Sequence, residues 1–76
     1  MAAASESRVL RFFGVEEAQV RQAASGLAGR CSLARIETRA QGAETLLALT
    51  APPSALRKAE GLLGRTFPGG LYGAGG

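Results

Sequence analysis

The chain has 76 residues, nine of them basic and six acidic, with a net charge of +3, and 46% of its residues are hydrophobic. It has no histidine and no aspartate, and Cys31 is its one cysteine. This composition excludes a disulfide framework and a structural zinc site, because zinc needs about four Cys, His or carboxylate ligands. It also removes histidine, the usual acid/base catalyst near neutral pH. We therefore expect one small, non-enzymatic domain with no catalytic, cofactor-binding or metal-binding residues.

The charged residues give little sign of a catalytic or membrane-bound protein. Among the glutamates only Glu16 and Glu17 are adjacent, and helix neighbours point about 100° apart, which suits a catalytic pair poorly. Eight of the nine basic residues are arginines spread along the chain, a pattern typical of a solvated surface, with a phosphate-binding face as the alternative. No apolar run approaches the ~20 residues of a membrane span, and no signal peptide is apparent. A cytoplasmic protein without membrane contact is expected.

The first part of the chain is predicted to be a tail followed by a strand. Residues 1–7, MAAASES, are small and polar and are expected to form a disordered N-terminal tail. Residues 8–13, RVLRFF, follow a strand pattern in which Leu10 and Phe12 share the core side. Gly14 then ends the strand.

A helix and a β-hairpin are predicted next. The helix covers residues 16–28, with acidic residues in the first turn, where the helix dipole favours them, and Gly26 and Gly29 end it. Residues 32–40 and 44–50 form two strands with alternating side chains, joined by a turn at a glycine. The apolar stripe of the helix consists of Val20, Ala23, Ala24 and Leu27.

The last part of the chain is predicted to form a second helix, and it determines whether the sheet has three or four strands. Pro52-Pro53-Ser54 begins a second helix, because proline suits a first turn. Leu71-Tyr72, between glycines, either adds a short fourth strand or simply ends the domain. The prediction is an α+β fold of order βαββα(β) over residues 8–73, with an antiparallel sheet, two helices on one face and a flexible end at 74–76. The apolar stripe of the second helix consists of Leu56, Ala59, Leu62 and Leu63.

Several segments resemble a known family. Residues 8–17, RVLRFFGVEE, followed by an alanine-rich helix, resemble the opening of the middle domain of bacterial competence/damage-inducible CinA-type proteins. Residues 62–65, LLGR, and 70–73, GLYG, are similar to its end, where a helix carrying Leu-Gly runs into a short strand ending in Tyr-Gly. The resemblance covers residues 8–73, and TFPG at 66–69 is an insertion relative to the family pattern.

The resemblance implies a KH-like or ferredoxin-like connector domain with no catalytic residue of its own. In longer relatives this domain lies between an N-terminal domain linked with ADP-ribose pyrophosphatase activity and a C-terminal nicotinamide-nucleotide amidase. It implies a role in pyridine-nucleotide salvage, in which the domain positions its catalytic neighbours. Flanking catalytic domains are thus the expected partners. The alternative partner is a second copy, because Val9 and Phe13 on the exposed sheet face need cover.

A stand-alone KH-like RNA-binding module is the alternative function. A KH phosphate loop is Gly-x-x-Gly between two helices. The two such segments here, 26–29 and 61–64, lack that context, so their glycines are interpreted as helix-capping or packing residues. Cys31 is expected to be a small buried or edge residue. The candidate contacts to an anionic ligand or partner are Arg35, Arg39, Arg57, Lys58 and Tyr72.

The sequence also suggests structural roles for three of these candidates. Arg35 and Arg39 share a strand face with Glu37 between them, which favours a cross-strand charge arrangement over a phosphate clamp. Tyr72 is expected mainly to pack in the core, and otherwise to stack on a ligand or dock a domain.

Overall fold

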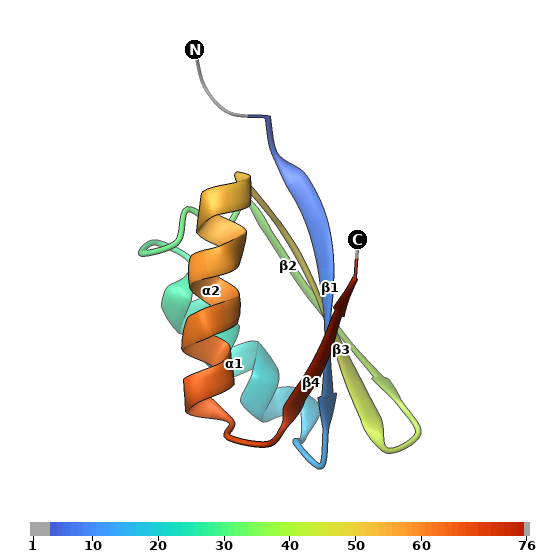
Figure 1. Ribbon diagram of the computed structural model, residues 1–76. Coiled ribbons are helices and arrows are strands. Elements are labelled where there is room, and N and C mark those ends of the chain that lie inside the picture. Colours follow the sequence, from blue (N-terminus) through green and yellow to red (C-terminus); the bar gives the residue numbers. More distant parts are fainter. Residues whose placement is uncertain (1–3, 76) are drawn as a thin grey trace.

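A computed structural model describes residues 4–75 of the chain (Figure 1). Its elements follow the order βαββαβ, and both helices cover the same side of the sheet. The predicted α+β fold is confirmed, and the fourth strand is present and longer than expected. The strands are β1 (Glu6–Phe13), β2 (Arg35–Gln41), β3 (Glu44–Ala51) and β4 (Leu71–Gly75), and the helices are α1 (Glu17–Leu27) and α2 (Pro53–Thr66).

The four strands form one antiparallel sheet in the order β2-β3-β1-β4. The two longest strands, β1 and β3, lie in the centre and pair along their whole length, with Leu10 opposite Leu47 and Val9 opposite Ala48. Because side chains alternate along a strand, one register fixes which residues face the helices. The two helices cover the face that holds Leu10 and Leu47.

Three predicted boundaries are wrong. Residues 1–7 do not all form a tail, because β1 begins at Glu6, and Ser7 pairs with Thr50, its hydroxyl 3.2 Å from the threonine hydroxyl. β2 begins at Arg35, not at residue 32, because turns continue after α1 and Ser32 has a positive φ of 52°. β4 extends to Gly75, into the predicted flexible end. Residues 1–3 and 76 lie outside the described residues.

The core lies between the helices and the covered face of the sheet. Leu10, Phe12, Leu47 and Leu49 of the sheet are at most 1% exposed, and the alternation had placed Leu10 and Phe12 on the core side. Each fully buried large apolar side chain stabilises the fold by about 1.5–3 kcal/mol. The ring of Phe12 packs edge-on against Phe67, with centroids 5.6 Å apart. The helices contribute Val20, Ala24, Leu56, Ala59 and Leu63 to this core.

Local signals explain where the helices begin. The backbone N–H of Glu16 donates to the side-chain oxygen of Gln19 at 3.3 Å, part of a capping box at the start of α1. Pro53 is the first residue of α2, where its missing N–H has no helical partner to lose. No helix within residues 4–75 combines the length and the apolar character that crossing a bilayer requires.

Candidate binding surface

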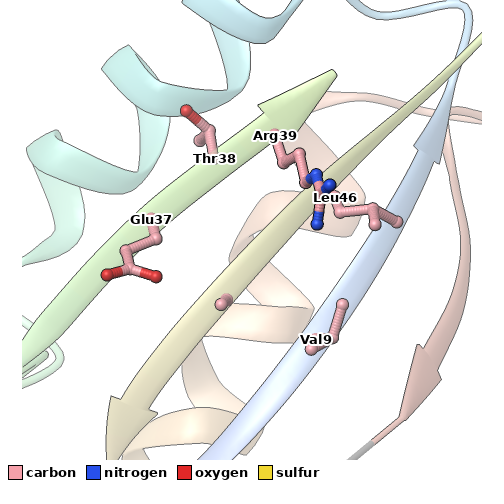
Figure 2. Close-up of a pocket in the computed structure, with 6 residues that line it drawn as sticks. Val9, Glu37, Thr38, Arg39 and Leu46 are labelled. Atoms are coloured by element: carbon pink, nitrogen blue, oxygen red, sulfur yellow. The ribbon is translucent and has the colours of Figure 1, made fainter. Parts of the chain in front are cut away.

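The side of the sheet opposite the helices is uncovered, and we call it the open face. Its centre is apolar, because Val9 of β1 and Leu46 and Ala48 of β3 point away from the core and are half-buried. Together with Glu37 and Arg39 of β2 they line a shallow groove of about 360 Å³. Figure 2 shows Arg39 extending over Leu46, so a charged group lies directly beside the apolar floor.

Two aromatic side chains lie at one end of the open face. Phe13 ends β1 and is 59% exposed, and Tyr72 of β4 is 52% exposed. Their rings meet edge to face, with centroids 6.4 Å apart. The expectation that Tyr72 packs in the core is therefore wrong, and the pair presents aromatic surface to solvent.

A β-bulge accounts for the position of Tyr72. Arg11 lies opposite Gly73 and Phe12 lies opposite Leu71, so the register shifts by one residue and Tyr72 has no residue opposite it. Such an irregularity re-aims a side chain without breaking the sheet. Here it sends the tyrosine across the end of β1, where its hydroxyl donates to the carboxylate of Glu44 on β3.

This contact changes the acidity of the phenol. Its hydrogen bond to Glu44 raises the pKa of Tyr72 above the ordinary value of 10.0, because a carboxylate accepts from the neutral phenol and not from the phenolate. Lost hydration and the charge of Glu44 act in the same direction, and the nearby guanidinium of Arg11 lowers the pKa. Tyr72 is thus a hydrogen-bond donor across the physiological pH range.

Two arginines flank the apolar floor. Leu46 lies opposite Arg39 on one side and opposite Arg11 on the other, so Arg39, Leu46 and Arg11 form one row across β2, β3 and β1. We call this the arginine row. Neither arginine forms an ion pair within residues 4–75. Arg11 lies beside the hydroxyl of Tyr72, but neither guanidinium has a carboxylate partner among these residues, so both can attract an anionic partner.

The acidic groups of the open face are held by other residues. Arg35 donates to Glu37 from two nitrogens, at 2.8 and 2.5 Å. This pair lies within β2, so the predicted cross-strand arrangement is wrong, because side chains two residues apart on one strand point the same way. Glu44 accepts from Tyr72. Each carboxylate on the face thus has a donor of its own.

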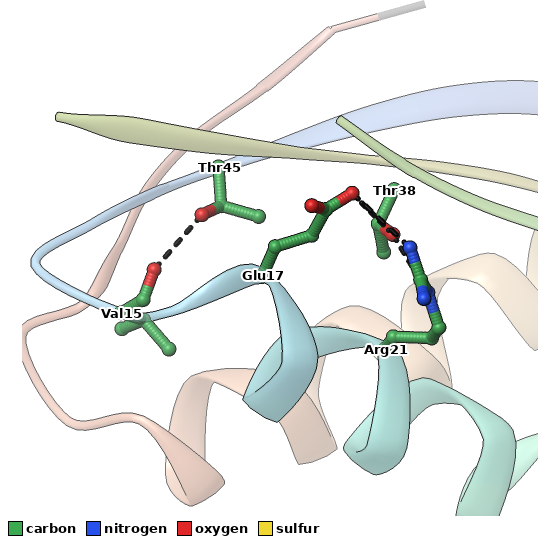
Figure 3. A network of polar contacts seen from close by, with 5 residues as sticks. All are labelled: Val15, Glu17, Arg21, Thr38 and Thr45. Atoms are coloured by element: carbon green, nitrogen blue, oxygen red, sulfur yellow. Dashed lines mark hydrogen bonds and ion pairs between the residues drawn. The ribbon is translucent and has the colours of Figure 1, made fainter. Parts of the chain in front are cut away.

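The opposite side of β2 is fixed to α1. Thr38 also lines the groove, but its hydroxyl donates to Glu17 at 3.0 Å and accepts from Arg21 at 3.0 Å (Figure 3). Next to this network, the hydroxyl of Thr45 donates to the carbonyl of Val15 at 2.8 Å. These contacts hold the edge strand β2 against the helical layer, so the open face has a firm support.

The five predicted contact residues separate into two groups. Arg35, Arg39 and Tyr72 lie on the sheet and belong to the open face. Arg57 and Lys58 lie on α2, in the other layer, and Arg57 lines a separate groove of about 480 Å³ beside Glu60 and Gly61. The sequence prediction therefore joined two surfaces that the fold keeps apart.

Sequence reasoning left Arg11 and Glu44 out of the predicted contact residues. The period-two pattern of the first strand did place Arg11 on the face away from Leu10, which was the available signal. It could not show that Arg11 and Arg39 share a row, because that follows from the pairing of both strands with β3.

The other residues with reactive or loop-forming potential form no further site in the part of the chain that the structure describes. Cys31 is buried, as expected. Of the Gly-x-x-Gly segments, Gly64 packs on Leu71, as predicted, whereas Gly26 and Gly61 lie within helices with open space around them, so they neither cap nor pack. No group of three or more potential metal ligands occurs in the part of the chain that the structure describes.

Comparison with known proteins identified no relative of this chain. No family model, curated protein or solved structure matches the chain. The resemblance to the CinA-type middle domain therefore stays a prediction.

Proposed function

We propose that this chain is a non-catalytic connector domain of a CinA-type pyridine-nucleotide salvage protein and that it positions neighbouring catalytic domains. The observation that supports this role is the place of the two ends of the domain. Gly75 of β4 lies opposite Val9 of β1, so both ends leave the sheet at the same side (Figure 1). Neighbouring strands are about 5 Å apart and β1 begins three residues before Val9, so the two ends are separated by roughly 11 Å and domains joined to them would lie close together.

A connector also has to hold its ends firmly. β1 pairs with β3 on one side and with β4 on the other, which ties both ends into one sheet. Near the start of β1, Arg8 forms an ion pair with Glu60 of α2 at 3.0 Å, which links the first strand to the second helix. These contacts support a fixed relative position of the two ends.

The proposal is tested by expressing the chain alone and together with whatever its gene encodes on either side. We expect no nicotinamide-nucleotide amidase or ADP-ribose pyrophosphatase turnover by the chain alone, and turnover by the longer protein. Energy transfer between dyes on the two neighbours should fall when the chain is replaced by a flexible Gly/Ser linker. Turnover by the 76 residues alone, or a gene without a catalytic neighbour, would contradict the proposal.

A further inference from the structure

We propose that the open face binds single-stranded RNA, with bases stacked on Phe13 and Tyr72 and phosphates held by Arg11 and Arg39. This goes beyond the connector role, which depends on the two ends of the domain. The face combines the two features that sequence-tolerant single-strand binding needs, which are exposed aromatic rings and basic groups without a carboxylate partner.

The aromatic pair offers the stacking surface. Phe13 and Tyr72 are each more than half exposed, and their edge-to-face contact fixes the position of both rings before any ligand arrives. Tyr72 is also held by its hydrogen bond to Glu44. Rings that are already ordered lose little freedom on binding, and every base has a π-face that can stack on them.

The arginine row lies at a suitable distance from this pair. Arg11 is two residues from Phe13 on the same face of β1, a separation of about 7 Å along a strand. A nucleotide whose base stacks on Phe13 can thus place its phosphate beside Arg11, and Arg39 can meet the next phosphate across Leu46. Arg35 pairs with Glu37, whereas Glu44 accepts only from the neutral phenol of Tyr72 and keeps its negative charge. The guanidinium groups of Arg11 and Arg39 outweigh that one carboxylate, so the face has a net positive charge.

Polar groups beside the aromatic pair favour RNA over DNA. Gln41 and Glu44 lie opposite each other at the Phe13 end of the face, and Glu44 lies opposite Phe13. The ribose 2′-hydroxyl is a donor and an acceptor, so it can donate to the free carboxylate lone pairs of Glu44 or bond to the amide of Gln41. Deoxyribose leaves these contacts unmade.

The basic residues of α2 provide an internal comparison. Arg57 and Lys58 are exposed and contribute the same charge as the arginine row, but they lie in the helical layer. No large exposed hydrophobic side chain accompanies them in the part of the chain that the structure describes. Binding by charge alone would use both surfaces, whereas the proposed site uses only the open face.

The test is fluorescence anisotropy of a labelled, unstructured RNA of ~10 nucleotides, titrated with the whole chain at low salt. We expect Phe13→Ala to weaken binding by roughly 5-fold or more, because one stacked base is lost. Arg39→Gln should weaken it and reduce the magnitude of the log-log salt slope by about 0.7, the value for one phosphate contact on a single strand. Arg57→Gln, the matched control, should leave the affinity and the salt slope nearly unchanged. The amide spectrum checks the fold of each variant.

Four results would overturn the proposal. The first is no binding at low salt. The second is equal weakening by Arg57→Gln and Arg39→Gln, which would indicate that RNA is attracted by the positive charge of the whole surface and not by the open face. The third is equal affinity for a DNA strand of the same sequence, which would remove the role of the 2′-hydroxyl. The last is a concentration-dependent dimer in sedimentation that Phe13→Ala abolishes, with RNA unable to compete, because a second copy would then occupy the face.

Discussion

Gly70→Ala is the substitution with the clearest steric consequence. A Cβ on Gly70 would lie 2.9 Å from Cγ2 of Val15 and 3.2 Å from both the Cβ and the carbonyl oxygen of Phe67. The backbone cannot easily retreat, because the N–H of Gly70 donates to Phe67 at 2.8 Å and its carbonyl accepts from Phe13 at 2.9 Å. Overpacking of this kind costs about 1–3 kcal/mol, so we expect the melting temperature to fall by roughly 5–20 °C.

Urea unfolding of a double-mutant cycle measures this effect. Val15→Ala removes the nearest atom, so Gly70→Ala should cost less in that background than in the natural chain. Gly61→Ala is the matched control: its Cβ meets nothing within 4 Å, and alanine in a helix should stabilise the fold by up to about 1 kcal/mol. The steric explanation would be refuted if Gly70→Ala left the free energy of unfolding unchanged. It would also be refuted if Gly70→Ala lowered that free energy equally in the natural chain and in the Val15→Ala variant.

Three further outcomes are expected. Tyr72 is the one tyrosine, so its phenolate absorbance should titrate above pH 10.0, and Glu44→Gln should lower that pKa; an unshifted midpoint in both proteins would contradict the hydrogen bond. Thr45→Val should cost about 1–2 kcal/mol in urea unfolding, because the carbonyl of Val15 loses its donor, and no loss would show that water replaces it. Leu47→Ala should cost about 2–5 kcal/mol by the same measurement, and a loss under 1 kcal/mol would place Leu47 outside the core.

The core and the element order could be predicted because they follow from side-chain periodicity. Leu10 and Phe12 recur with the period of two of a strand, and the apolar stripes of both helices recur at helical spacing, so burial follows from the local pattern. The first residues of β1 could not be found in this way. Glu6 and Ser7 are polar and exposed, and they are in a strand because β3 is long enough to pair with them.

The candidate binding surface was harder to predict, because it depends on register. Tyr72 reaches the open face through a β-bulge, and the glycine-rich sequence around it gives no signal for a bulge at this position. Arg11 and Arg39 become neighbours of one leucine only through two strand pairings. Arg57 and Lys58 were predicted with Arg39 on charge alone, and charge does not specify a layer of the fold.

Amide chemical shifts of the labelled chain during titration with single-stranded RNA test most directly whether the open face is a binding surface. We expect the largest shifts at Arg11, Phe13, Arg39, Leu46 and Tyr72, which lie on four strands and on one face. Shifts that cluster at Arg57 and Lys58 of α2, or no shifts at low salt, would contradict this assignment.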